Sequence, residues 1–143
     1  MNQLSLVIED DKDIAEIFEQ ALSISGFDTE ILYDGEAASK RLKEVVPHVV
    51  VLDMHLPGIS GQELIVQIRS DPRLIKTIVL LATADAMLAE THSEKADFVL
   101  VKPISFSQLR DLASRLHDYH HGGTGPLGIG KIIETKYKPE DST

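Results

Sequence analysis

The side chains that could do chemistry in this sequence are four acids, one threonine and one lysine, each placed after a short apolar run. They are Glu9, Asp10, Asp11, Asp53, Thr83 and Lys102. Carboxylates held close together repel one another, and one takes up a proton unless a cation lies among them. A hard divalent ion such as Mg²⁺ meets that need, because it binds one or two carboxylates together with water and substrate phosphate. The set therefore indicates a metal-dependent phosphorylation site on an aspartate.

Each member of the set has a role that its functional group allows. An ionised aspartate beside a cation can attack phosphorus and form an acyl phosphate, and Asp53 is the candidate. Lys102 can hold phosphoryl oxygens as a point charge, and Thr83 can hold them as a hydroxyl donor. Taken singly, these residues are ordinary helix caps, loop starts, strand residues and surface amines. Their joint placement after successive apolar runs is what favours a site.

The elements that must position these residues alternate along the chain. Short apolar runs, typical of buried strands, lie at 4–8, 27–32, 49–52, 78–81 and 98–101. Apolar residues recur at helical spacing in most of the intervening segments, although 87–95 makes a poor helix. Five strand–helix units predict an α/β fold, a (βα)5 doubly wound parallel five-stranded sheet. Ligands bind beyond the carboxyl ends of such strands, so the candidate residues are expected to meet at one edge.

Helix positions can be predicted in more detail near the amino terminus. The first helix is expected to bury the apolar positions Ile14, Ile17, Phe18, Ala21 and Leu22. Gly26 follows as a C-terminal stop, because glycine is favoured just beyond helix ends. Asp34 is placed to cap the next helix with its carboxylate.

Composition and charge exclude several classes of protein. The 143 residues contain 14 Lys and Arg against 23 Asp and Glu, a formal net charge of −9, and no cysteine. An acidic balance disfavours contacts with nucleic-acid phosphates. The absence of cysteine excludes disulfide and thiol chemistry. No apolar run approaches the roughly 20 residues that span a bilayer, so we expect a cytoplasmic protein without membrane contact.

The carboxyl-terminal part of the chain differs in composition from the rest. Five of the nine glycines lie between positions 122 and 130, a density typical of a linker. The acidic excess lies entirely before this stretch. We therefore predict one domain at 1–121 and a glycine-rich linker and tail at 122–143, with no output domain. Ile132-Ile133 with Lys136-Tyr137-Lys138 is compatible with a short strand, a docking segment or the point where a longer protein was cut.

Four dispersed motifs resemble those of a known family. They are Val7-Ile8-Glu9-Asp10-Asp11, Leu52-Asp53-Met54-His55-Leu56-Pro57-Gly58 with Gly61, Thr83-Ala84, and Val101-Lys102-Pro103. In this order and spacing they resemble the receiver domain of two-component response regulators, over residues 4 to about 119. The resemblance implies the flavodoxin-like strand order 2-1-3-4-5.

The resemblance also implies a role for each site residue. A phosphoryl group from a sensor histidine kinase, a phosphotransfer protein or a small phosphodonor would be taken onto Asp53. Mg²⁺ would be held by Glu9, Asp10, Asp53 and the backbone carbonyl of His55. Thr83, Ala84 and Lys102 would surround the phosphoryl group, and the Lys102-Pro103 peptide would be cis. His55 and Asp85 stand where the family tunes the lifetime of its phosphoryl group.

Three features depart from the family pattern. Glu9 replaces the commoner aspartate, and Val99 stands where an aromatic side chain commonly swings inward with the threonine. Only 19 positions separate Thr83 from Lys102, which predicts a truncated or irregular fourth helix. Phosphorylation is therefore expected to act through a surface other than the one usual for the family.

These observations lead to one main hypothesis and two alternatives. The chain is expected to be a phosphoacceptor signalling domain, not an enzyme, that promotes only its own phosphorylation and dephosphorylation. Its partners would be a kinase or phosphotransfer protein and a downstream protein effector, and homodimerisation stays open. The alternatives are a receiver-like interaction module without phosphorylation and a Mg²⁺-dependent phosphohydrolase with an aspartate nucleophile. The hydrolase usually has a second carboxylate two residues after the nucleophile, where this chain has His55.

Overall fold

The sheet at the centre of the molecule is parallel throughout. The computed structural model describes residues 3–85, 87, 94–117 and 131–134. The strands are β1 (Leu4–Ile8), β2 (Asp28–Leu32), β3 (Val49–Asp53), β4 (Ile78–Thr83), β5 (Phe98–Val101) and β6 (Lys131–Glu134). They lie in the order β2-β1-β3-β4-β5-β6, with every neighbouring pair parallel. The expected order 2-1-3-4-5 is confirmed. Beyond it the sheet has a sixth strand. Of the three alternatives left for 132–138, the structure shows a short strand over its described part, which ends at Glu134.

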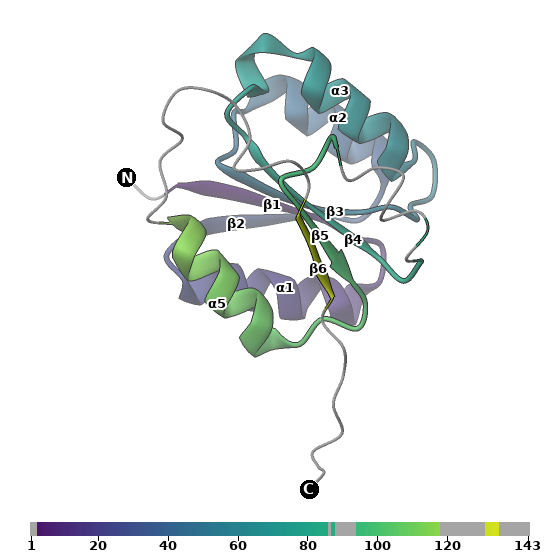
Figure 1. Ribbon diagram of the computed structural model, residues 1–143. Helices are drawn as coiled ribbons and strands as arrows, with labels where there is room; N and C mark the ends of the chain where they lie inside the picture. The colour runs from purple at the N-terminus through teal and green to yellow at the C-terminus, as the bar shows by residue number, and fades with distance from the viewer. Residues whose placement is uncertain (1–2, 86, 88–93, 118–130, 135–143) are drawn as a thin grey trace, which may run out of the picture.

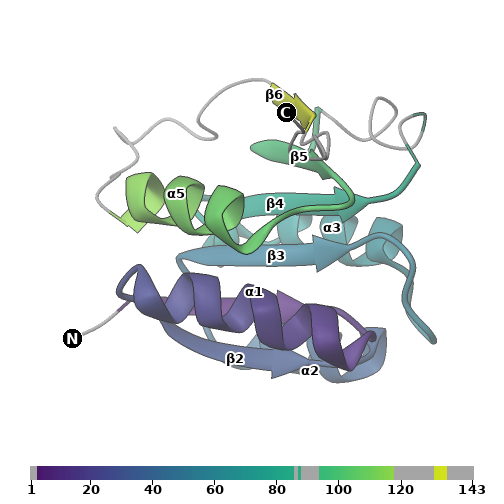
Figure 2. The ribbon, with the colours of Figure 1, turned by 90° about the horizontal axis from the view of Figure 1, so that it is seen from below.

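Helices cover both faces of the sheet, as the alternating pattern predicts (Figure 1). The helices are α1 (Lys12–Ile24), α2 (Gly35–Glu44), α3 (Gly61–Ser70), the 3₁₀ helix η1 (Pro72–Leu74) and α5 (Phe106–His117). Helices α1 and α5 lie on one face, and α2 and α3 lie on the other, which Figure 2 shows from below. The poor helix expected at 87–95 falls mostly outside the described residues. No helix within the described part of the chain is long and apolar enough to cross a membrane.

The core consists of two apolar layers that follow the strand alternation. In β3 every residue is buried. Val50 and Leu52 pack with α2 and α3, whereas Val49 and Val51 pack with α1 and α5. This double coverage explains why the strands appear in the sequence as continuous apolar runs.

Polar caps fix where the helices begin relative to the strand ends. Asp34 accepts the amide of Ala37 at 2.8 Å, as the sequence predicts. Gly26 follows α1 with φ of +106°, the left-handed conformation that glycine adopts at helix ends. One expected core position is wrong, because Ile17 is 41% exposed.

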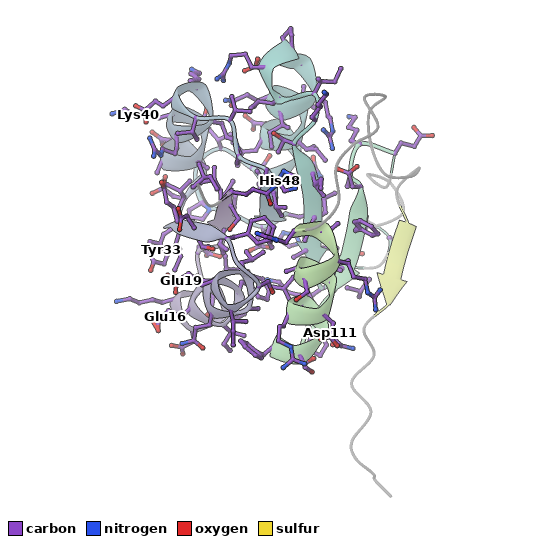
Figure 3. The ribbon with its side chains drawn as sticks, turned by 90° about the vertical axis from the view of Figure 1, so that its left-hand side faces the viewer. Glu16, Glu19, Tyr33, Lys40, His48 and Asp111 are labelled. Carbon is purple, nitrogen blue, oxygen red and sulfur yellow. The ribbon has the colours of Figure 1, made fainter. Side chains whose placement is uncertain are left out.

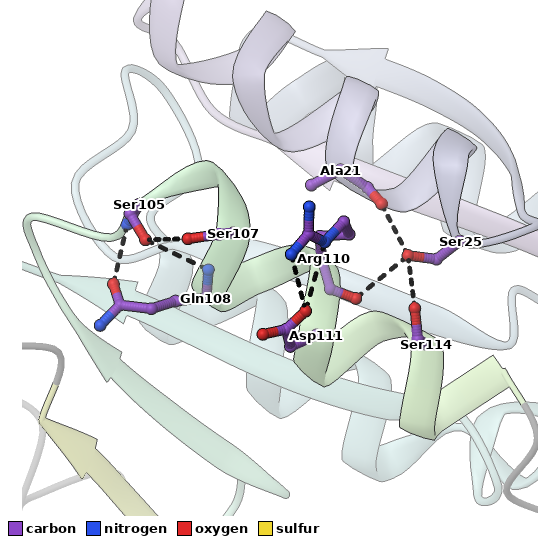
Figure 4. Close-up of polar contacts among 8 residues, drawn as sticks. All are labelled: Ala21, Ser25, Ser105, Ser107, Gln108, Arg110, Asp111 and Ser114. Atoms are coloured by element: carbon purple, nitrogen blue, oxygen red, sulfur yellow. Dashed lines mark hydrogen bonds and ion pairs between the residues drawn. The ribbon is translucent and has the colours of Figure 1, made fainter.

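Hydroxyl groups tie α5 to α1 on one face of the sheet (Figure 4). The Oγ of Ser25 lies 2.8 Å from the carbonyl oxygen of Ala21 and 3.2 Å from that of Arg110. The Oγ of Ser114 donates to Ser25 at 3.3 Å. These contacts hold α5 against the carboxyl end of α1.

Acidic side chains outside the strand ends are spread over the helix surfaces. Figure 3 shows Glu16 and Glu19 on α1 and Asp111 on α5. Glu16 is exposed, and the side chain of Asp111 is 60% exposed. Charges in such positions are well solvated, so they contribute little to stability.

Candidate functional site

Four of the expected site residues lie at the carboxyl ends of adjacent central strands. Glu9 follows β1, Asp53 ends β3, Thr83 ends β4 and Lys102 follows β5. The register aligns these ends, because Asp53 pairs with Ala82 and Thr83 pairs with Val101. The fold therefore brings together two carboxylates, the hydroxyl of Thr83 and the amine of Lys102 from four separate sequence motifs.

The acids form a compact cluster. Glu9, Asp10 and Asp53 each offer a carboxylate oxygen, and these oxygens all lie within 4.8 Å of one another. Glu9 and Asp53 are only 1% and 4% exposed, whereas Asp10 is exposed. Carboxylate oxygens of this number and spacing suit a hard divalent cation that keeps part of its water shell. The donor set fits Mg²⁺.

Lys102 provides the positive charge that faces this cluster. Its Nζ lies 2.8 Å from Glu9 Oε1 and 3.5 Å from Asp53 Oδ1. Two buried carboxylates would be costly without such a partner, because removing a charge from water requires compensation by an opposite charge. Lys102 therefore balances both acids at once, and its closer partner is Glu9.

The protonation equilibria of the pair are shifted by this environment. Burial raises the pKa of Glu9 to about 7, an effect that the hydrogen bond from Lys102 partly offsets and the charge of Asp53 reinforces. For Lys102, burial alone would lower the pKa. The hydrogen bond to Glu9 and the charges of both carboxylates outweigh it, so the pKa is raised. The ammonium group consequently remains charged.

A pH effect on stability follows from the raised pKa of Glu9. Its ordinary value is 4.5, so between about 4.5 and 7 the folded chain binds this proton more tightly than the unfolded chain. Without divalent metal, the free energy of unfolding should therefore fall as pH rises through this window, by ~1–3 kcal/mol relative to Glu9→Gln. Urea denaturation in a chelator at pH 5 and pH 8 measures the difference. Glu16→Gln, an exposed site on α1, is the control, and an identical pH dependence for Glu9→Gln and wild type would contradict the prediction.

Thr83 ends β4, one position after the residue that pairs with Asp53. The residue is fully buried, and its Oγ1 accepts the amide of Asp85 at 3.0 Å. In this bond the hydroxyl is an acceptor, so it can still donate its proton to a phosphoryl oxygen. Ala84 and Asp85 are exposed beside it. The small Ala84 side chain leaves the approach from solvent open.

The loop after β3 is bound to Asp53 by its own backbone. The amide of His55 donates to Asp53 Oδ1 at 3.3 Å, and its side chain is exposed. The amide of Met54 donates to the carbonyl oxygen of Ala82 at 3.1 Å. The bond from His55 restrains the Asp53 carboxylate, and the bond from Met54 holds the start of the loop against β4. The role of the His55 carbonyl as a metal ligand stays a prediction.

Gly61 allows α3 to approach this loop closely. A Cβ at this position would overlap the backbone oxygen of Asp53 and come within 2.7 Å of Met54 Cα. Gly61→Ala is therefore expected to lower the free energy of unfolding by about 1–3 kcal/mol, because backbone must move to accept the methyl group. It should also weaken phosphorylation by displacing Asp53. Denaturant titration measures the loss, with Gln62→Ala, exposed in the same helix turn, as control; equal stability of the two variants would refute the close contact.

An apolar cavity adjoins the polar cluster. Its volume is about 350 Å³, and its walls come from α1 and from the loop between β5 and α5. Ile14, Ile17 and Phe18 line one side, and Pro103 and Ile104 line the other. The exposed Ile17 thus lies at the wall of a cavity next to the site. The Lys102-Pro103 peptide in this loop is cis, as the resemblance implies.

Sequence reasoning missed one buried ion pair, which lies at the amino-terminal end of β5, the end opposite the site. Asp97 is fully buried directly before β5, and its Oδ2 accepts from Arg69 at 3.0 Å and from the Val79 amide at 2.8 Å. Arg69 also donates to the backbone oxygens of Lys95 and Thr77. The only sequence signal was an acid immediately before an apolar run, which is common at exposed strand ends.

Fold and site together define a flavodoxin-like α/β domain with an oxygen-rich pocket at the carboxyl edge of its sheet. The sequence model of the response regulator receiver domain family matches residues 5–114. The DNA-binding response regulator MtrA of Mycolicibacterium smegmatis is 33% identical over 134 residues, which cover 92% of this chain and 58% of that protein. The chain therefore belongs to the response regulator receiver family of two-component signalling systems.

Solved structures agree with this assignment. The Francisella response regulator 1452 receiver domain superposes with a TM-score of 0.72 at 26% identity, covering 81% of this chain and 97% of that one. The chemotaxis response regulator CheY4 of Vibrio cholerae gives a TM-score of 0.73 at 22% identity over 81% and 99% of the two chains, a likeness of fold. The chain spans about half the length of the curated relatives it matches, with shares of 58%, 41% and 48%.

Proposed function

We propose that this domain accepts a phosphoryl group on Asp53 in a Mg²⁺-dependent reaction and signals by contact with another protein. The observation that carries the proposal is the meeting of three carboxylates within 4.8 Å, with Lys102 Nζ 3.5 Å from Asp53. The donor would be the phosphohistidine of a histidine kinase or of a phosphotransfer protein, or a small phosphodonor.

Each site residue would have a separate role in phosphoryl transfer. Glu9, Asp10, Asp53 and the carbonyl of His55 would hold Mg²⁺, which when bound neutralises charge on the transferring phosphoryl group. An oxygen of Asp53 attacks phosphorus, the P–N bond to the donor imidazole breaks, and its electron pair stays on that nitrogen. The Lys102 ammonium, which lies 2.8 Å from Glu9 and 3.5 Å from Asp53, would turn toward the phosphoryl oxygens and balance their charge. The Thr83 hydroxyl donates to another phosphoryl oxygen.

A phosphodonor protein would bind at the apolar cavity beside the site. The cavity between α1 and the loop that carries Pro103 and Ile104 offers an apolar surface beside the exposed Ala84. A kinase or phosphotransfer protein presenting a histidine to Asp53 would bury this surface.

We assign receiver function to residues 1–121 and no output domain to 122–143. Within these 143 residues we propose no nucleic-acid contact, in keeping with the net charge of −9, and a cytoplasmic setting.

The test is adduct formation with acetyl phosphate or beryllofluoride, with and without Mg²⁺. We expect a metal-dependent gain of one phosphoryl group by intact-protein mass spectrometry and its absence in Asp53→Asn. Asp13→Asn, an exposed acid in the first turn of α1, is the matched control and should behave as wild type. No adduct under any condition would favour a receiver-like interaction module. Turnover of a phosphomonoester would favour a phosphohydrolase.

Two exposed side chains near the site are expected to set the lifetime of the phosphoryl group. His55 and Asp85 follow Asp53 and Thr83 by two positions, and both face solvent. Side chains exposed at these positions could contact a water that attacks the acyl phosphate, whereas the incoming phosphoryl group would be held by Lys102. Substituting either residue with alanine should change the dephosphorylation rate more than the phosphorylation rate. The prediction is tested by measuring the phosphorylation and dephosphorylation rates separately. Equal effects on both rates would refute it.

A further inference from the structure

Strand β6 gives β5 a second neighbour in the sheet. Its four residues pair in parallel with β5, from Phe98 opposite Lys131 to Val101 opposite Glu134. In β5, Val99 and Leu100 are buried in opposite apolar layers. Without β6 this apolar strand would form the edge of the sheet and present unpaired backbone groups there.

The pairing continues directly into the phosphoacceptor site. Val101 pairs with Thr83 on one side and with Glu134 on the other, so a single row of backbone positions joins β4, β5 and β6. The next backbone bond runs from the Lys102 amide to the Thr83 carbonyl oxygen, at 2.8 Å. The carboxyl end of β6 therefore pairs with the residue that precedes Lys102, and one strand, β5, separates it from Thr83.

The attachment of β6 to the rest of the chain suits reversible docking. In sequence, 13 residues with five glycines separate His117 at the end of α5 from Lys131. Within the described residues β6 pairs only with β5. A covalently tethered segment meets its docking strand at an effective concentration on the order of millimolar, so a four-residue strand can dock without strong intrinsic affinity.

We propose that β6 is a tethered regulatory strand whose docking on β5 is strengthened when Asp53 carries a phosphoryl group. This inference rests on the proposed function. Phosphoryl oxygens bound by the Thr83 hydroxyl and the Lys102 ammonium would tie the ends of β4 and β5 to β3. The backbone at the end of β5 is then already ordered. Docking of β6 therefore has to order fewer residues and costs less conformational entropy.

The side chains of β5 favour a backbone route for this coupling. Val99 is fully buried and aliphatic at the position where the family commonly carries a switching aromatic residue. Phe98 packs in the opposite layer, with α1 and α5. Neither side chain can reproduce a swinging ring beside Thr83. The row of paired backbone positions from Thr83 through Val101 to β6 is the connection that remains.

Amide hydrogen exchange of the full chain tests the proposal. Adding beryllofluoride and Mg²⁺ should slow exchange at residues 131–134 by about fivefold or more, the lower range of measured allosteric coupling. Asp53→Asn should show no slowing. Fluorine NMR reports independently whether the adduct forms. If the adduct forms and exchange at 131–134 is unchanged or faster, the inference is overturned. If no adduct forms, the proposed function fails, and the inference fails with it.

Reciprocity supplies a second measurement. Because coupling free energies are symmetric, removing β6 must weaken beryllofluoride binding by the same factor by which the ligand slows exchange. The double variant Ile132→Pro/Ile133→Pro removes two backbone donors from the strand, and Ser142→Pro is the matched control outside β6. If the proline variant fails to fold by circular dichroism, Ile132→Gly/Ile133→Gly replaces it. Unchanged beryllofluoride affinity in the folded variant would overturn the inference.

Discussion

Replacing Asp97 with alanine is expected to lower the free energy of unfolding by about 3–5 kcal/mol, since breaking a buried ion pair leaves its partner charge unbalanced. The carboxylate is fully buried, and it accepts hydrogen bonds from both Arg69 and the Val79 amide. Alanine leaves a guanidinium that is mostly buried and a backbone N–H that has lost its acceptor. Urea denaturation of the two proteins at neutral pH measures the loss.

The exposed ion pair between Arg110 and Asp111 provides a matched control. Its distance of 3.1 Å is close to the 3.0 Å between Arg69 and Asp97, but its side chains are 43% and 60% exposed. Asp111→Ala should therefore cost at most about 1 kcal/mol, as exposed ion pairs usually do. Similar losses for Asp97→Ala and Asp111→Ala would show that burial of Asp97 does not govern its contribution.

Replacing Lys102 with methionine should slow phosphorylation by acetyl phosphate on the order of 100- to 1000-fold, the usual cost of removing one donor to a developing charge. Methionine keeps the apolar length of the side chain but removes the ammonium that lies 3.5 Å from Asp53 and 2.8 Å from Glu9. The transferring phosphoryl oxygens then lack their only cationic side chain among the described site residues. Time courses by intact-protein mass spectrometry at saturating Mg²⁺ give the rate.

Lys76→Met separates this loss from a general effect of removing positive charge. Lys76 is exposed before β4, and its replacement changes the net charge by the same amount. It should leave the phosphorylation rate near that of wild type. A Lys102→Met protein that is folded and phosphorylated as fast as Lys76→Met would rule out the proposed role of the ammonium.

Strand–helix alternation was sufficient to predict most of the fold. Runs such as 49–52 are continuous and apolar because both faces of β3 are covered. Such a run can be recognised from the sequence alone. The strand order came from the resemblance, because alternation alone does not determine which strands become neighbours. Strand β6 could not be chosen over the alternatives, since four residues carry too little periodicity to distinguish a strand from a docking segment.

The membership of the site was predictable, whereas its internal pairing was not. The rule that residues after parallel strands share an edge places Glu9, Asp53 and Lys102 together. It cannot say that Lys102 lies closer to Glu9 than to Asp53, because that preference depends on side-chain reach and burial. The exposure of Ile17 was missed for a related reason: helical spacing defines a stripe, but its edge is set by which neighbours cover it.

The strand order also determines how the sheet can grow as the chain leaves the ribosome. After β1 and β2 have paired, β3 joins the free side of β1, and β4, β5 and β6 are then added in turn at that same side. Every newly made strand therefore meets an edge that is already present, and none has to be inserted between strands that are already paired. Because synthesis proceeds from the amino terminus, this topology allows assembly in the order of translation. Among the described strands, β6 is made last and lies at the side where the sheet grows.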